Sequence, residues 1–132
     1  MKFFICSLEG ILLGIPAGDT ERIIPAPRVQ ENFFETDKDG GYISLPALFK
    51  KSFPAPHGMI LKTGDPSRRL VLLVPRIDTD LDVPGDRIRG MPAVLAGVFP
   101  CFREACFLGE DMILLLQTGK LAEAVPQGAP HD

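Results

Sequence analysis

The sequence has few of the residues on which enzymes, metal proteins and membrane proteins depend. It contains no tryptophan, and its 132 residues include only two histidines and three cysteines. An odd number of cysteines disfavours a disulfide framework and suits a reducing compartment, so we expect a cytoplasmic protein. No run reaches the roughly 18 apolar residues that a membrane-spanning helix needs. Direct insertion into a membrane is therefore not expected.

Strong charge of one sign is also missing. Fourteen Lys and Arg residues stand against 17 Asp and Glu residues, which gives a net charge of −3. Because a nucleic-acid surface needs a basic stripe, nucleic acid is excluded as an expected partner. The two basic clusters, Arg68-Arg69 and Arg87 with Arg89, have the acidic neighbours Asp65 and Asp86. They are either solvated surface or anchors of a protein interface.

The residues that catalysis or metal binding would use are scattered. His57 and His131 fall in a predicted loop and a predicted tail, and four residues separate Cys101 from Cys106. A zinc site needs about four converging ligands, so we expect no metal, no cofactor and buried structural thiols. The chain also lacks a phosphate-binding glycine loop and a nucleophile elbow. The sequence thus favours a protein that is not an enzyme.

Asp78, Asp80 and Asp82 resemble the start of a calcium loop, but the match then fails. Its sixth position, which needs glycine, is Val83, and its twelfth, which needs glutamate, is Arg89. In an extended segment the alternation places the three carboxylates on one face. That face is either simply solvated or an acidic contact patch.

The first part of the chain predicts a β-hairpin. Phe3–Leu8 and Ile11–Ile15 are apolar runs of strand length, and Glu9-Gly10 between them suits a tight turn. A secretory signal peptide is the competing interpretation, but this turn interrupts the apolar run too early. After Pro16, Asp19 or Thr20 is expected to cap a short helical turn that ends near Ile24.

Two further hairpins and a few short elements complete the predicted fold. The predicted strand pairs are Met59–Lys62 with Leu70–Val74, and Cys106–Leu108 with Met112–Leu116. The other predicted elements are a strand at Tyr42–Leu45, a short helix from Pro46 to Lys51, a strand in the first half of Pro75–Gly90 and a helical turn at Thr118–Ala124. We therefore expect one all-β domain, a barrel or sandwich over residues 1–124, followed by a flexible C-terminal tail at 125–132.

The order of these pieces resembles the CheW-like family of chemotaxis coupling domains, over Phe3 to Glu123. The opening FFICSLEGILLGIPAGDTERII is similar to the family's first hairpin, and its Gly14-Ile15-Pro16 matches the family's Gly/Ala-Ile-Pro. GYISLPALFK is similar to a strand and short helix of the family, and CFLGEDMILLLQTGKLAE to its closing hairpin and helix. Each match is an apolar pattern, so the signal lies in their shared order and spacing.

The resemblance implies two intertwined SH3-like five-stranded barrels with a few short helices, and no catalysis. It implies an adaptor of bacterial chemotaxis-type signal transduction that couples the cytoplasmic tip of a chemoreceptor to the regulatory domain of a histidine kinase. The residues that match the family's interface stretches are Ile15, Thr20, Arg22, Ile24 and Ser44. Ile15 and Ile24 are equally well explained as core residues.

The sequence departs from the family at the implied contacts. The family's Asn-x-Arg-Gly turn is replaced by Thr36–Gly41, which has no arginine. Arg22 stands where the family has glutamate, and Ser44 where it has aspartate. These changes keep an alternative open, namely a CheW-like interaction module that has lost its coupling to the kinase and receptor.

Overall fold

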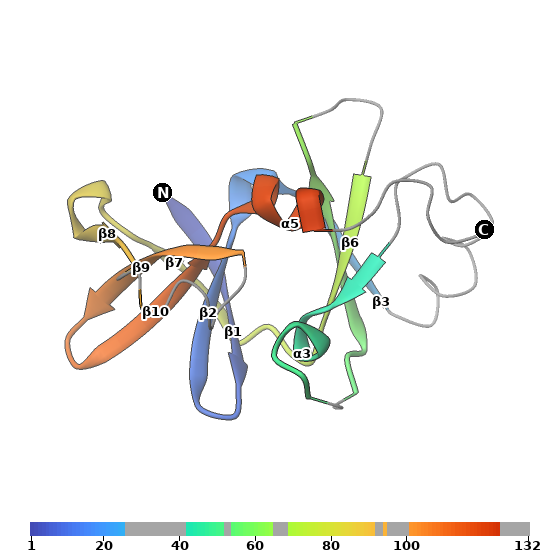
Figure 1. The fold of residues 1–132 in the computed structure, drawn as a ribbon, viewed down its shortest axis with the longest axis horizontal. Helices are drawn as coiled ribbons and strands as arrows, with labels where there is room; N and C mark the ends of the chain where they lie inside the picture. Colours follow the sequence, from blue (N-terminus) through green and yellow to red (C-terminus); the bar gives the residue numbers. More distant parts are fainter. Residues whose placement is uncertain (26–41, 52–53, 65–68, 92–93, 95–100, 125–132) are drawn as a thin grey trace.

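The computed structural model describes residues 1–25, 42–51, 54–64, 69–91, 94 and 101–124 (Figure 1). The replaced turn at Thr36–Gly41 and the expected tail at 125–132 lie outside these residues. The described strands form two sheets, one of six strands and one of four.

The six-stranded sheet has the order β7-β1-β2-β10-β9-β8. Its strands are β1 (Lys2–Leu8), β2 (Ile11–Pro16), β7 (Thr79–Asp82), β8 (Ile88–Gly90), β9 (Phe102–Leu108) and β10 (Asp111–Leu116). All neighbours are antiparallel except β2 and β10, which run parallel. The predicted hairpins β1–β2 and β9–β10 are both confirmed, with Gly10 and Gly109 at positive φ in their turns.

The four-stranded sheet has the order β3-β5-β6-β4. Its strands are β3 (Thr20–Pro25), β4 (Tyr42–Ser44), β5 (His57–Lys62) and β6 (Arg69–Val74). β5 and β6 form the predicted middle hairpin, and β4 runs parallel to β6. Among the described residues, the short helices α3 (Leu45–Leu48) and α5 (Thr118–Ala124) lie near the positions expected for them.

The two sheets lie side by side and are intertwined along the chain (Figure 1). The chain builds β1 and β2 of the first sheet, then the whole second sheet, and returns to the first sheet with β7 to β10. The predicted all-β fold with two intertwined units is thereby confirmed. The described strands divide six and four, where the resemblance implies five in each barrel.

The prediction for Thr20–Ile24 is wrong. The helical turn lies earlier, as a 3-10 helix η1 at Ala17–Asp19 without a side-chain cap, and Thr20 already begins β3. β-branched residues such as Thr20, Ile23 and Ile24 favour extended backbone, and β3 pairs antiparallel with β5. Since β5 lies more than thirty residues further on, the pairing has no local signal in the sequence.

One large apolar cluster, the joint cluster, contains side chains from both sheets. It contains Leu13 and Leu114 of the first sheet, Leu72 of the second, and Leu45 and Leu121 from α3 and α5. β6 has apolar residues on both faces, as its sequence predicts. Its alternate residues enter the joint cluster, while Val71 and Leu73 belong to a separate one.

The three cysteines are free and buried, as predicted. A second cluster, within the first sheet, includes Cys106 and Val83.

Asp80 and Asp82 are exposed: Asp80 pairs with Lys2 at 3.4 Å, and Asp82 with the chain's amino group at 3.2 Å. These two carboxylates agree with the solvated-face interpretation. The side chain of Asp78 does not, because it is only 25% exposed and is paired with Arg76.

Candidate partner-binding site

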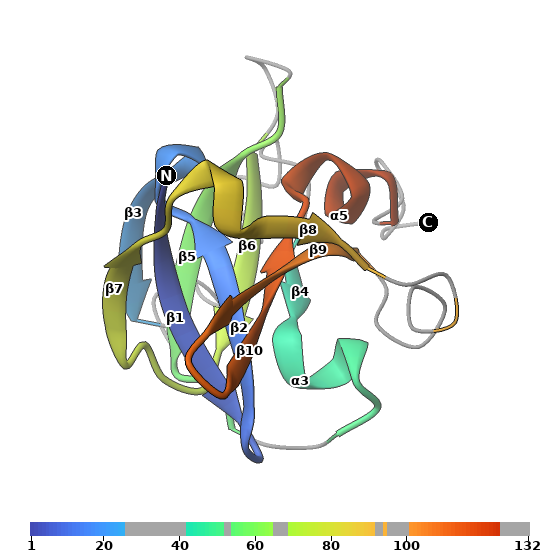
Figure 2. The same cartoon turned by 90° about the vertical axis from the view of Figure 1, so that its left-hand side faces the viewer.

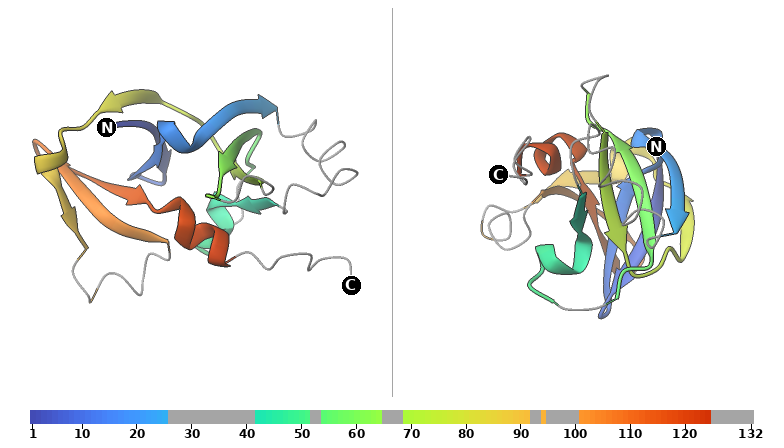
Figure 3. Two further views of the ribbon diagram at one scale, coloured as in Figure 1. Left: turned by 90° about the horizontal axis from the view of Figure 1, so that it is seen from above. Right: turned by 90° about the vertical axis from the view of Figure 1, so that its right-hand side faces the viewer.

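Strand β3 is an open edge of the second sheet. Within the described part of the chain it pairs only with β5, and Figures 2 and 3 show it at one margin of that sheet. The pairing register shifts between Thr20 and Arg22, so the strand carries a bulge near its start. A strand edge with unpaired backbone groups is a template for another chain, and a bulge or a charge limits unspecific pairing.

Arg22 is the most available of the predicted contact residues. It lies opposite Ile60 of β5 and is exposed. Among the residues that the structure describes, its guanidinium makes no hydrogen bond or ion pair. The adjacent Glu21, in contrast, is paired with Arg69 of β6. The edge therefore presents one uncompensated positive charge beside a neutralised carboxylate.

Thr20 and Ile24 lie on either side of Arg22 and are half-buried. The Thr20 hydroxyl donates a hydrogen bond of 3.0 Å to the Pro16 carbonyl, which fixes the entry into β3. Ile24 packs against the separate cluster of Val71 and Leu73. Both residues shape the strand, and part of each remains accessible to a partner.

Ile15 is the one predicted contact that the structure removes. Its side chain is fully buried in the joint cluster, so it cannot touch a partner in this conformation. The alternation of β2 explains this position, because Leu13 and Ile15 share the face that meets the second sheet.

Ser44 is not brought together with the other predicted residues. It lies on β4, opposite Leu73, at the far edge of the same sheet. Strands β5 and β6 separate it from β3, a distance of about 14 Å at the usual strand spacing. A partner that contacts both Arg22 and Ser44 would have to cross the sheet.

Sequence reasoning missed Ile23, which is 40% exposed on β3 next to Arg22. It was placed in a helical turn, and only a strand assignment would have shown it as an apolar residue on an open edge. The run of β-branched residues before Pro25 was the available signal.

The described groups do not assemble a chemical site. Burial, with a smaller effect of the Asp78 carboxylate, raises the pKa of the Cys6 thiol to about 12. Burial also raises the pKa of Cys101 and Cys106. All three therefore stay protonated and poorly nucleophilic at neutral pH. Within the described ranges, no three His, Cys, Asp or Glu side chains are grouped to hold a metal ion.

The described helices are also too short or too polar to cross a lipid bilayer. The feature that stands out on the four-stranded sheet is the edge strand β3, on which Arg22 and Ile23 are both exposed.

The two intertwined sheets and their joint core define the CheW-like class of all-β folds. Among solved structures, the chain is similar to the scaffolding protein TtCheW from Thermoanaerobacter tengcongensis, with a TM-score of 0.65 and 14% sequence identity. The match covers 88% of this chain and 83% of that one. At this identity the likeness establishes the fold. No family model matches the sequence, and no curated protein matches it either.

Proposed function

We propose that the chain is a non-catalytic adaptor of a bacterial chemotaxis-type signalling system, working in the cytoplasm. It binds the regulatory domain of a histidine kinase and the cytoplasmic tip of a chemoreceptor. The CheW-like fold supports this proposal, since the similar structure is that of a scaffolding protein. The observation that carries it is the open β3 edge, where Arg22 has no partner in the described part of the chain.

The contact residues in this proposal are Arg22 and Ile23, with Thr20 and Ile24 at their sides. The strand edge supplies backbone donors and acceptors, Ile23 an apolar contact and Arg22 the charge that selects the partner. Because Arg22 stands where the family has glutamate, the partner's matching position is expected to be acidic. Ser44 belongs to a second contact on β4, in a different part of the sheet.

The test is calorimetry of the full chain against the regulatory domain of the histidine kinase encoded in the same genome. We expect micromolar or tighter binding. Arg22→Glu should weaken it by roughly five- to thirtyfold, about 1–2 kcal/mol, while the melting temperature stays unchanged. Arg103→Glu is the matched control, since Arg103 is an exposed arginine on β9 of the other sheet.

Equal affinity of wild type and Arg22→Glu would remove β3 from the interface. No binding by a folded wild-type chain would contradict kinase coupling itself. That second result would favour the alternative, a CheW-like interaction module in another assembly. The alternative rests on two sequence facts, the reversed charge at Arg22 and the lack of arginine in Thr36–Gly41.

A further inference from the structure

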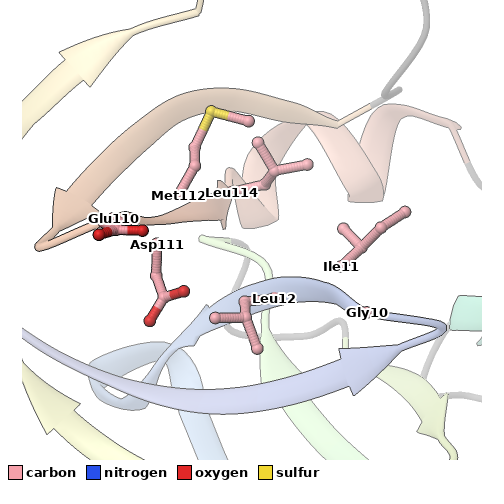
Figure 4. A pocket seen from close by; sticks show the side chains of 7 residues that line it. All are labelled: Gly10, Ile11, Leu12, Glu110, Asp111, Met112 and Leu114. Carbon is pink, nitrogen blue, oxygen red and sulfur yellow. The ribbon is translucent and has the colours of Figure 1, made fainter.

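A groove opens in the first sheet at the point where its parallel strand pair begins. It encloses about 330 Å³ and lies between β2 and β10 (Figure 4). The lining residues are Gly10, Ile11, Leu12, Glu110, Asp111, Met112 and Leu114. The groove therefore belongs to a different sheet from the β3 edge.

The groove exists because the two strands pair late. Their register runs from Leu12 opposite Ile113 to Gly14 opposite Leu115, and no pairing precedes it. Ile11 and Met112, which come one residue earlier, are thus not held together by the ladder. The side chains between the strands form the floor, and Leu114 is buried there.

The floor continues into an exposed apolar surface. Met112 is 37% exposed, and Phe107 of β9, its direct partner in the antiparallel register, is 53% exposed. Ile11 packs against the edge of the joint cluster. Two large hydrophobic residues are thus exposed side by side next to a groove. Such an arrangement is more typical of a docking surface than of the rest of a protein surface.

The rim of the groove is acidic. Glu110 and Asp111 are exposed, and neither has an ion-pair partner among the described residues. Glu9, in the neighbouring turn, is instead neutralised by Lys51 at 3.0 Å.

The carboxylates of Glu110 and Asp111 both line the groove. In Figure 4, Asp111 projects from β10 towards Leu12, on the opposite side of the strand from Met112, and Glu110 lies at the end of the strand.

This charge decides between possible occupants. A second copy docked symmetrically through the same groove would bring two acidic rims together, which is unfavourable. An apolar segment that carries Lys or Arg would satisfy both parts of the groove, because its apolar side chains fill the floor while its cations meet Glu110 and Asp111.

We propose that this groove docks an apolar segment of another protein, flanked by Lys or Arg residues. The contact is separate from the β3 edge and does not rest on kinase binding. Met112 and Phe107 provide the apolar contacts, and the two rim carboxylates select for the basic flank. The protein thereby has a docking surface on each of its two sheets.

The experiment uses a random 12-residue peptide library displayed on phage, selected on the immobilised full-length chain. We expect enriched peptides with two or more large apolar residues next to Lys or Arg. Calorimetry with one synthetic enriched peptide should then show binding that weakens as salt rises, because the rim charges are exposed. Met112→Ser and Phe107→Ser should each lower the affinity about tenfold.

The decisive variant is the double charge reversal Glu110→Lys with Asp111→Lys. It should change the selected sequences from basic to acidic flanks while keeping their apolar residues. Asp86→Lys, an exposed carboxylate outside the groove, is the matched control and should select basic peptides as the wild type does. Circular dichroism melts of each variant establish that the fold is retained.

Three results would overturn the proposal: no enrichment, enrichment of peptides without basic residues, or binding that survives both serine variants. None of them bears on the kinase experiment, which uses a different surface and a different ligand.

Discussion

Gly14 is a buried position of β2 that has no room for a side chain. A Cβ built there would lie 2.8 Å from Cδ2 of Leu115, which is itself buried. Gly14→Ala should therefore destabilise the protein by about 1–3 kcal/mol, as overpacking of cores does. Leu115→Ala alone should cost about 2–5 kcal/mol. Leu115→Ala also removes the methyl group that obstructs a Cβ at position 14. The double variant should therefore lose less stability than the two single variants lose together.

Denaturant unfolding of the wild type, the two single variants and the double variant gives the coupling free energy between positions 14 and 115. Gly18→Ala is the control, because a Cβ at Gly18 meets nothing within 4 Å. Strict additivity of the two core substitutions would show that the contact with Leu115 is not what requires glycine at this position.

Cys6 links stability to alkaline pH. Its pKa is raised from the ordinary 9.0 to about 12 by burial. As the pH rises, the thiol therefore loses its proton in the unfolded chain before it does so in the folded chain. The contribution of the protonated Cys6 thiol to the free energy of unfolding is complete below pH 9 and is lost between pH 9 and 12. The wild type should lose stability in this window more steeply than Cys6→Ala, by at most about 1.4 kcal/mol per pH unit.

Urea unfolding of both proteins from pH 7 to 11 measures this difference. Cys101 and Cys106 are present in both proteins, so their contributions cancel. Parallel curves above pH 9 would mean that the Cys6 thiol ionises equally easily in the folded and unfolded chain.

At the scale of elements, local sequence patterns predicted the elements whose strand partners lie close by in the sequence. The hairpins β1–β2, β5–β6 and β9–β10 follow from apolar runs separated by turn residues, and Thr118–Ala124 from its position after the last strand. The β3 strand and the parallel pairing of β2 with β10 were not predicted, because both depend on partners far along the chain. The groove beside Met112 is a consequence of that pairing, so the sequence carries no signal for it.

In the candidate site, too, the sequence located the segment but not the exposure of its residues. The resemblance pointed to the segment containing Arg22, which the structure shows as an edge strand, but it could not tell an exposed residue from a buried one. Ile15 and Ile23 are both isoleucines of short apolar stretches, and only their positions in β2 and β3 assign one to the core and the other to the open edge.

Helix α5 is tied to the crossover between the sheets by a part-buried hydrogen bond. Thr118, its first residue, is 5% exposed and donates from Oγ1 to Oδ2 of Asp19 at 2.9 Å. Asp19 ends η1, which connects β2 to β3. Thr118→Val keeps the shape but leaves the carboxylate without this donor, so we expect a loss of about 1–3 kcal/mol.

Thermal and denaturant melts of Thr118→Val, Asp19→Ala and the double variant measure the coupling between the two residues. Thr79→Val on the exposed strand β7 is the control, with an expected change within about 0.5 kcal/mol. If Thr118→Val behaved like this control, the bond would not contribute to holding α5 in place.

At the scale of the molecule, the chain path makes the two sheets interdependent. The joint cluster takes side chains from both sheets and both helices, and the first sheet is completed only after the second has been built. Each sheet also has a smaller apolar cluster of its own, but the largest cluster is shared between them. We therefore expect a single cooperative unfolding transition, with equal calorimetric and van't Hoff enthalpies.

Leu72→Ala tests this interdependence from one side. Leu72 is fully buried on β6 of the second sheet, and its truncation should cost about 2–5 kcal/mol. NMR amide signals of β6 report on the second sheet, and those of β10 report on the first. Both sets should shift to the same lower midpoint. If β6 melted earlier while β10 kept its wild-type midpoint, the sheets would be independent units. A partner bound at β3 could then not influence the groove on the other sheet through the shared core.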